Sequence, residues 1–275
     1  MAKGTLGIIG CPILEDEIVY SLRKEADEKK VYVVDTPPSL SLRKKMDLFG
    51  IPYSPIGEWD FRNGYAEIDR DNGFNIVVLM KKLGLHAYPE KLRAELEDEM
   101  MFCQGRMDVI ALYYGMCGNA GWDPSEWAAG SLNIPVFVFR DENEDVCDDC
   151  IGVAVGGHSR YCDFVKKYTG MLFVTPAIAG NWEDFKKELD MVKGFEIMGI
   201  FTTKEVFELF GYKNAVKIDT GIGIKGEELE RGCESLSKDT GLAFITAAPG
   251  SANIYPTDRL YKDAKDSLGC RSGNI

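Results

Sequence analysis

Apolar residues recur along the chain in short runs, separated by longer segments that mix apolar and charged residues. Eight of these runs are apolar at nearly every position and rich in β-branched and aromatic residues. Such runs are typical of strands that are covered on both faces. They predict strands at residues 5–10, 31–35, 74–81, 108–114, 134–140, 171–175, 214–219 and 242–246.

Helical patterns lie between the runs, as in residues 88–103, where Pro89 suits a first helical turn. Alternation of strands and helices predicts an α/β fold with a doubly wound, mostly parallel sheet and helices on both faces. We expect one domain over residues 1–275, which two similar Rossmann-like halves could build. A subdivision near residues 179–180 is the alternative to a single domain.

Two stretches depart from this alternation. Residues 51–72 are rich in turn-forming and aromatic residues, and we expect an excursion or a hairpin there. Residues 141–149, with the sequence DENEDVCDD, are expected to form an acidic loop.

Composition and charge narrow the classes of function. The 275 residues carry a net charge of -12 that is spread along the chain, which argues against nucleic acid or an anionic membrane as the main partner. No apolar run is long enough to span a bilayer, and the N-terminus is interpreted as a first strand rather than a signal peptide. We therefore expect a soluble, cytoplasmic protein, whose eight cysteines are not a disulfide framework.

Three cysteines follow predicted strands. Cys11 ends the first strand, Cys117 follows the fourth, and Cys150 opens a helix after the fifth strand and the acidic loop. Ligands of open α/β sheets gather at the carboxyl ends of the strands, so the three thiols could converge there. A helix N-terminus would also stabilise the thiolate of Cys150. For any one cysteine taken singly, simple packing in the core is the alternative.

The sequence resembles the family of uncharacterised proteins catalogued as domain of unknown function 1638. The resemblance is carried by "GCPILEDEI", "LGLHAYPEKLRAELE", "DVIALYYGMCGNAG", "DDCIGVAVGGHSRY", "TGMLFVTPAIAGNW" and "KIDTGIG". In the family pattern, cysteines stand at the positions of Cys11, Cys117 and Cys150. The chain departs from the pattern at Asp148, where the family has a histidine, and in the acidic loop that brings Cys147. The missing histidine puts in doubt any mechanism that needs an imidazole beside Cys150.

The resemblance implies a place in the metabolism of anaerobes, methanogens included, close to corrinoid-dependent methyl transfer. A corrinoid protein or a methyltransferase is the implied partner. Three thiolates would suit an iron–sulfur cluster with one open iron, or zinc with an exchangeable fourth position. We expect a metal–thiolate protein that acts in electron transfer, activation or methyl handling. The alternatives are an accessory protein without chemistry of its own, for which the acidic loop is the candidate contact, and a zinc-dependent methyltransferase.

Other residues are weaker candidates for the same site. Cys147 forms a C-x-x-C pair with Cys150 and is either an extra ligand or an exposed side chain outside the site. Asp149, Asn119, His86 and His158 are further candidates, and an aromatic wall is expected from Tyr113, Tyr114, Trp122 and Trp182.

The segment GIGIKG matches G-x-G-x-x-G through Gly221, Gly223 and Gly226. It lies between a predicted strand and a predicted helix, which is the setting of an anion-binding loop. No acidic residue follows the next strand, which argues against a dinucleotide. A plain tight turn is the favoured interpretation, and anion binding is the second.

Overall fold

The structure is a computed structural model that describes residues 2–69, 73–83, 88–119, 121–188 and 201–269. Within these residues, nine strands form two sheets, and every pair of neighbouring strands is parallel. All eight predicted strands are present. The larger sheet has the strand order β3-β2-β4-β1-β5-β6 and comprises β1 (Gly4–Gly10), β2 (Lys30–Asp35), β3 (Ser54–Gly57), β4 (Phe74–Met80), β5 (Val109–Tyr113) and β6 (Val136–Val138).

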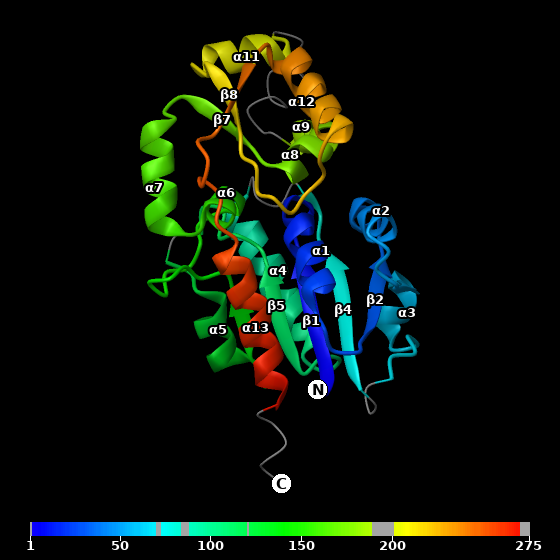
Figure 1. Cartoon of the computed structure of the whole chain (residues 1–275). Coiled ribbons are helices and arrows are strands. Elements are labelled where there is room, and N and C mark those ends of the chain that lie inside the picture. The colour runs from blue at the N-terminus through cyan, green and yellow to red at the C-terminus, as the bar shows by residue number, and fades with distance from the viewer. Residues whose placement is uncertain (1, 70–72, 84–87, 120, 189–200, 270–275) are drawn as a thin grey trace.

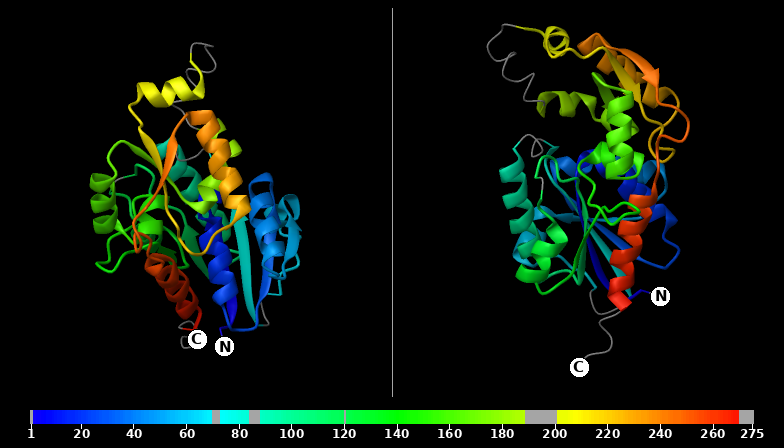
Figure 2. Two further views of the ribbon diagram at one scale, coloured as in Figure 1. Left: turned by 45° about the horizontal axis from the view of Figure 1, so that its top comes forward. Right: turned by 90° about the vertical axis from the view of Figure 1, so that its left-hand side faces the viewer.

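Helices cover both faces of this sheet, which confirms the doubly wound α/β fold. In Figure 2, α1 and α13 lie on one face, and α4 and α5 lie on the other. The continuous apolar runs of the central strands follow from this double cover, since β4 and β5 are buried at every residue. The helices packed around this sheet, which together form the lower lobe of the molecule, are α1 (Glu15–Lys24), α2 (Leu40–Leu48), α3 (Glu58–Asn63), α4 (Pro89–Cys103), α5 (Pro124–Ser131), α6 (Cys150–Val155) and α13 (Tyr255–Gly269). The next helix after α6, α7 (His158–Lys167), lies beside β7 (Met171–Val174) of a second, upper lobe.

A smaller lobe sits over the carboxyl ends of the six strands (Figure 1). Its three-stranded sheet has the order β7-β8-β9, so the second unit is only half as wide as the first. Residues 179–180 lie inside one of its helices, α8. This upper lobe comprises β7 (Met171–Val174), β8 (Asn214–Lys217), β9 (Ala243–Thr246), α8 (Pro176–Gly180), α9 (Trp182–Glu188), α11 (Thr203–Leu209) and α12 (Glu227–Thr240).

The excursion at residues 51–72 is an edge strand followed by a short helix. β3 pairs with β2 in parallel, and α3 follows it directly. The hairpin alternative is therefore wrong, because a hairpin would pair its strands antiparallel. Residues 70–72 lie outside the described part of the chain.

The path of the chain creates a crevice beside β1. β1 lies between β4 and β5 in the sheet. The loop after β1 leads to α1 on one face of the sheet, whereas the loop after β5 leads to α5 on the opposite face. Loops that leave neighbouring strands in opposite directions open a crevice at the strand ends, where α/β proteins bind ligands. The upper lobe roofs this crevice.

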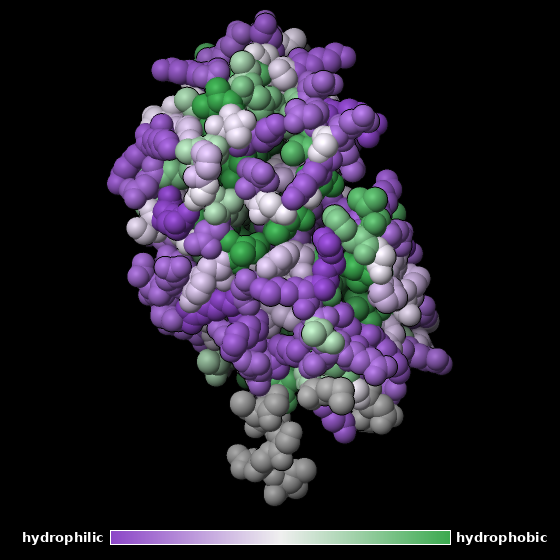
Figure 3. Space-filling view, in the orientation of Figure 1, coloured by the Kyte–Doolittle hydropathy of each residue, from purple (hydrophilic) through white to green (hydrophobic). Residues whose placement is uncertain are grey.

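The surface agrees with this arrangement. On the face seen in Figure 3, hydrophilic side chains dominate, and apolar ones show in smaller patches on both lobes and at the level where the lobes meet. Within the described residues, no helix combines the length and the apolar character that crossing a membrane requires.

Candidate functional site

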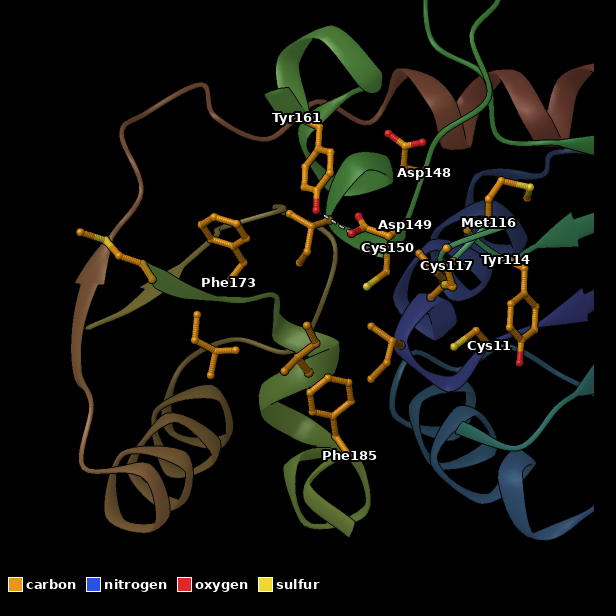
Figure 4. Close-up of a pocket in the computed structure, with 18 of the residues that line it drawn as sticks. Cys11, Tyr114, Met116, Cys117, Asp148, Asp149, Cys150, Tyr161, Phe173 and Phe185 are labelled. Atoms are coloured by element: carbon orange, nitrogen blue, oxygen red, sulfur yellow. Dashed lines mark hydrogen bonds between the residues drawn. The ribbon is translucent and has the colours of Figure 1, made fainter. Parts of the chain in front are cut away.

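The three cysteines predicted to converge do line one cavity, of about 650 Å³, between the two lobes. Cys11 follows β1, Cys117 lies in the loop after β5, and Cys150 is the first residue of α6. Figure 4 shows the three thiols on one side of this cavity. Cys11 and Cys150 lie 139 positions apart in the sequence. They reach the same wall of the cavity because the carboxyl ends of parallel strands lie at one edge of the sheet.

Backbone contacts hold the three loops together. The N–H of Cys11 donates to the carbonyl of Tyr113 at 3.0 Å, and the N–H of Cys117 donates to the carbonyl of Asp148 at 2.7 Å. A Cβ at Gly115 would lie 2.5 Å from the Cα of Asp149. Glycine therefore lets the loop after β5 pack directly on the backbone that leads into α6.

Cys117 has an unusual backbone conformation. Its φ is 46°, in the left-handed region, and only one other non-glycine residue of the described chain, Glu144, shares this feature. A side chain in this region costs about 1–2 kcal/mol. Such strain is concentrated at functional positions, where the surrounding structure imposes it.

Asp149 prepares the start of α6. Its Oδ1 accepts the N–H of Gly152 at 2.7 Å, and its Oδ2 accepts the hydroxyl of Tyr161 at 2.8 Å. The first contact is an N-cap, which explains why the helix begins at Cys150 as predicted.

The thiols are protonated in the metal-free site. Burial raises the pKa of Cys11 to about 12, and the nearby carboxyl groups of Glu15 and Glu17 act in the same direction. Burial also raises the pKa of Cys117 and of Cys150, with further contributions from Asp149 and from the other thiols. For Cys150 the effects of desolvation and neighbouring negative charges exceed any stabilisation of the thiolate by the helix N-terminus.

The donor set suits a thiophilic metal in its chemistry. Asp149 is already engaged by two hydrogen bonds and Asp148 contacts His158, whereas the three thiols line the cavity. No described lining residue is Lys, Arg or His, so a bound cation is what would allow the thiols to ionise together. In the described residues, no three or more His, Cys, Asp or Glu side chains are gathered tightly enough to hold a metal.

Three of the other candidates lie outside the cavity wall. Asn119 turns back on its own loop, where its amide donates to the carbonyl of Met116 at 3.1 Å. His158 opens α7 and its Nδ1 lies 2.7 Å from Asp148, whose carboxylate raises the pKa of the imidazole. Cys147 is fully buried, so the expectation of an exposed side chain is wrong. His86 lies outside the described residues.

Only one of the four predicted wall aromatics faces the cavity. Tyr114 lines it, whereas Tyr113 points to the opposite side of β5 and donates its hydroxyl to Ser21 at 2.8 Å. Trp122 is buried elsewhere in the core. The indole N–H of Trp182 donates to Asp239 at 2.9 Å, which fixes it inside the upper lobe.

The G-x-G-x-x-G segment uses its middle glycine for close packing between the lobes. A Cβ at Gly223 would lie 2.3 Å from Oδ2 of Asp16 and 2.5 Å from Cβ of Pro176. Gly221 and Gly226 have positive φ angles of 74° and 63°. A carboxylate already faces Gly223, which supports the tight turn over anion binding at this position.

A buried charge cluster beside the site was not predicted. Glu15, Asp16 and Glu17 occupy the first turn of α1 and are at most 4% exposed. Lys45 of α2 contacts both Glu15 and Asp16. Burial raises the pKa of Glu17 to about 8, and its Oε2 has no hydrogen-bond partner. The signal was the sequence EDE, which at a helix N-terminus normally indicates a solvated face.

One of the comparisons with known proteins identifies a family. No curated protein and no solved structure matches the chain. Residues 80–255 match the family model described as a protein of unknown function, DUF1638. This span includes Cys117 and Cys150, while Cys11 precedes it. Since the match covers more than half of the 275 residues, the chain belongs to the DUF1638 family.

Proposed function

We propose that this chain is a cytoplasmic metal–thiolate protein in which Cys11, Cys117 and Cys150 hold an iron–sulfur cluster. The observation that carries the proposal is that three cysteines, from three separate loops, line one cavity at the carboxyl ends of the strands. A cluster held by three thiolates supplies an open iron that acts as a Lewis acid, or a centre that passes an electron. We place the protein in anaerobic one-carbon or corrinoid-linked methyl metabolism, in electron transfer, activation or methyl handling, with a corrinoid protein or methyltransferase as partner.

The residues of the chain have distinct tasks in this proposal. The cysteines supply the donors and release their protons when they bind, so affinity for metal rises with pH. Asp149 caps α6 and holds the backbone of Cys150 in place. The apolar upper wall, which includes Leu172 and Phe173, lines the same cavity as the thiols.

Zinc is the alternative occupant of the same three donors. A zinc ion with an exchangeable fourth position would suit activation of a thiol substrate for methyl transfer. The chemistry of the donors supports both metals. Iron–sulfur is favoured because the three proposed ligands, on three separate loops, are all sulfur atoms.

An accessory role without chemistry is the second candidate function. It is supported by the acidic loop, in which residues 142–145 are exposed. The base of this loop is fixed, because Asp141 is buried and Glu144 pairs with Arg259 at 2.6 Å. Metal-free protein that co-purifies with a methyltransferase or corrinoid protein under anaerobic conditions would favour this role.

Serine variants test the ligand set. Replacing Cys11, Cys117 or Cys150 by serine should lower the metal content per chain at least about tenfold after anaerobic purification, because each removes one donor. Cys162→Ser is the matched control: this cysteine is partly exposed on α7 and does not line the cavity. Full metal retention in all three cavity variants would overturn the proposal.

A further inference from the structure

The cavity has an aromatic wall opposite the thiols. Tyr161, Phe173 and Phe185 stand on three sides of it in Figure 4, and Cys150 stands on the fourth. Phe173 comes from β7 and Phe185 from α9, so both belong to the upper lobe. Aliphatic and thioether side chains fill the gaps between the rings: Ile13, Leu14, Met116, Ile151, Met171, Leu172 and Ile178. A ligand with an apolar body would exchange water for this wall.

The charges around the cavity have one sign. Asp148 and Asp149 are the ionisable side chains of its described lining besides thiols and tyrosines, and no described lining residue is Lys, Arg or His. His158 pairs with Asp148 from outside the cavity. The hydrogen bonds to Asp149 come from Gly152 and Tyr161, which are neutral donors, so among the described residues no positive side chain is bonded to its carboxyl group.

Metal binding would not reverse this sign. Three thiolates carry three negative charges and a zinc ion carries two positive charges, so the zinc site would have a net charge of about −1. The same holds for a four-iron cluster in its 2+ state. An anionic ligand would therefore lose its hydration without gaining an opposite charge, whether or not the metal is bound. A cation gains the carboxylate and the negative faces of the rings.

We infer that the cavity binds a small organic cation with an apolar body, next to the three thiols. The inference deepens the proposed function, because it names the class of molecule that would reach the metal centre. The inference depends on the proposed function only where it assumes that the three thiols hold a metal. The charges and rings that carry it are present in the metal-free chain as well.

Three probes of the same shape and different charge test the inference. Benzyltrimethylammonium is the cation, neopentylbenzene is its neutral isostere, and phenylmethanesulfonate is an anion of similar size. Dissociation constants would be measured by titration calorimetry on full-length protein, both as purified without oxygen and after removal of metal by a chelator. We expect the cation to bind about tenfold more tightly than the neutral isostere, and the anion to bind most weakly.

Two variants separate the rings from the charge. Phe173→Leu keeps an apolar wall but removes a ring face, and Asp149→Asn keeps a capping side chain but removes the charge. Each should weaken binding of the cation by about three- to tenfold and leave the affinity for the neutral isostere within about twofold. Phe210→Leu is the control, since Phe210 is 56% exposed and does not line the cavity.

The outcomes distinguish this inference from the proposed function. A cation that binds selectively to protein without metal would support the inference while the proposed function fails. Metal-loaded protein that binds the neutral isostere or the anion as tightly as the cation would overturn the inference and leave the function standing. Binding of none of the three probes, in either form of the protein, would also overturn it.

Discussion

Replacing Lys45 by methionine is expected to lower the free energy of unfolding by about 3–5 kcal/mol. The Lys45 ammonium is buried, 2.8 Å from Oε1 of Glu15 and in contact with Asp16. Burial lowers its pKa, but the two carboxylates outweigh burial and raise it, so the side chain is charged. Methionine would fill the volume and leave two carboxylates buried without their cation.

The loss of the Lys45 charge should also weaken the contact between the two lobes. Glu15 also accepts hydrogen bonds from Ser41 of α2 at 2.9 Å and from Asn181, between α8 and α9 of the upper lobe, at 2.7 Å. Asp16 packs against Gly223 of the upper lobe. Because this cluster joins the lobes beside Cys11, its loss should also loosen the roof of the cavity.

Lys44→Met is the matched control for this prediction. Lys44 is the preceding residue of α2 and is exposed, so its loss should change stability by less than about 0.5 kcal/mol. Urea denaturation of both variants at pH 7 would measure the difference. The deficit of Lys45→Met should shrink at low pH, because burial raises the pKa of Glu15 and so favours its neutral, protonated form there. Equal denaturation midpoints for the two variants at pH 7 would contradict this account of the cluster.

Glu17→Gln is expected to stabilise the protein at pH 8, by about 3–5 kcal/mol. Burial raises the pKa of Glu17 to about 8 in the folded state, from an ordinary value of 4.5, and the nearby charge of Asp16 adds to this. At about 1.36 kcal/mol per pH unit, that difference corresponds to at most about 5 kcal/mol. Glutamine resembles the protonated carboxyl that the folded protein holds.

The sign of the pH dependence follows from proton binding. Between pH 4.5 and about 8 the folded state keeps a proton on Glu17 that the unfolded state releases, so wild-type stability falls as pH rises through this window. The stabilisation by Glu17→Gln should therefore be small at pH 4.5 and largest at pH 8. Glu28→Gln, at an exposed position, serves as the control. A gain for Glu17→Gln that does not grow between pH 5 and pH 8 would show that Glu17 is ionised in the fold.

The strands could be predicted from sequence because they are buried on both faces, and burial gives continuous apolar runs. β3 was missed because it is an edge strand with the sequence SPIG, in which only Ile56 is buried. The convergence of Cys11, Cys117 and Cys150 could also be predicted. It follows from one rule, that the carboxyl ends of parallel strands share one edge of the sheet.

Features that depend on contacts between distant elements could not be predicted. Successive side chains of a strand point to opposite faces, so Tyr113 and Tyr114 could not both face the cavity. Which of the two tyrosines faces the cavity is decided by the orientation of β5 in the sheet and by the helix that packs on each face. Glu15 and Asp16 resemble solvated helix-start residues, and they are buried only because α2 and the upper lobe cover them. The aromatic wall likewise comes from the upper lobe.

Metal and acid-labile sulfide analysis of anaerobically purified protein, together with its absorption spectrum, tests the central claim most directly. The account predicts a brown protein that contains iron and sulfide, both of which are lost in Cys11→Ser, Cys117→Ser and Cys150→Ser. A colourless protein with stoichiometric zinc would keep the thiolate site and replace the cluster by the zinc alternative. Protein without any metal after gentle anaerobic handling would contradict the claim, and the three cysteines would then be packed thiols beside a ligand cavity.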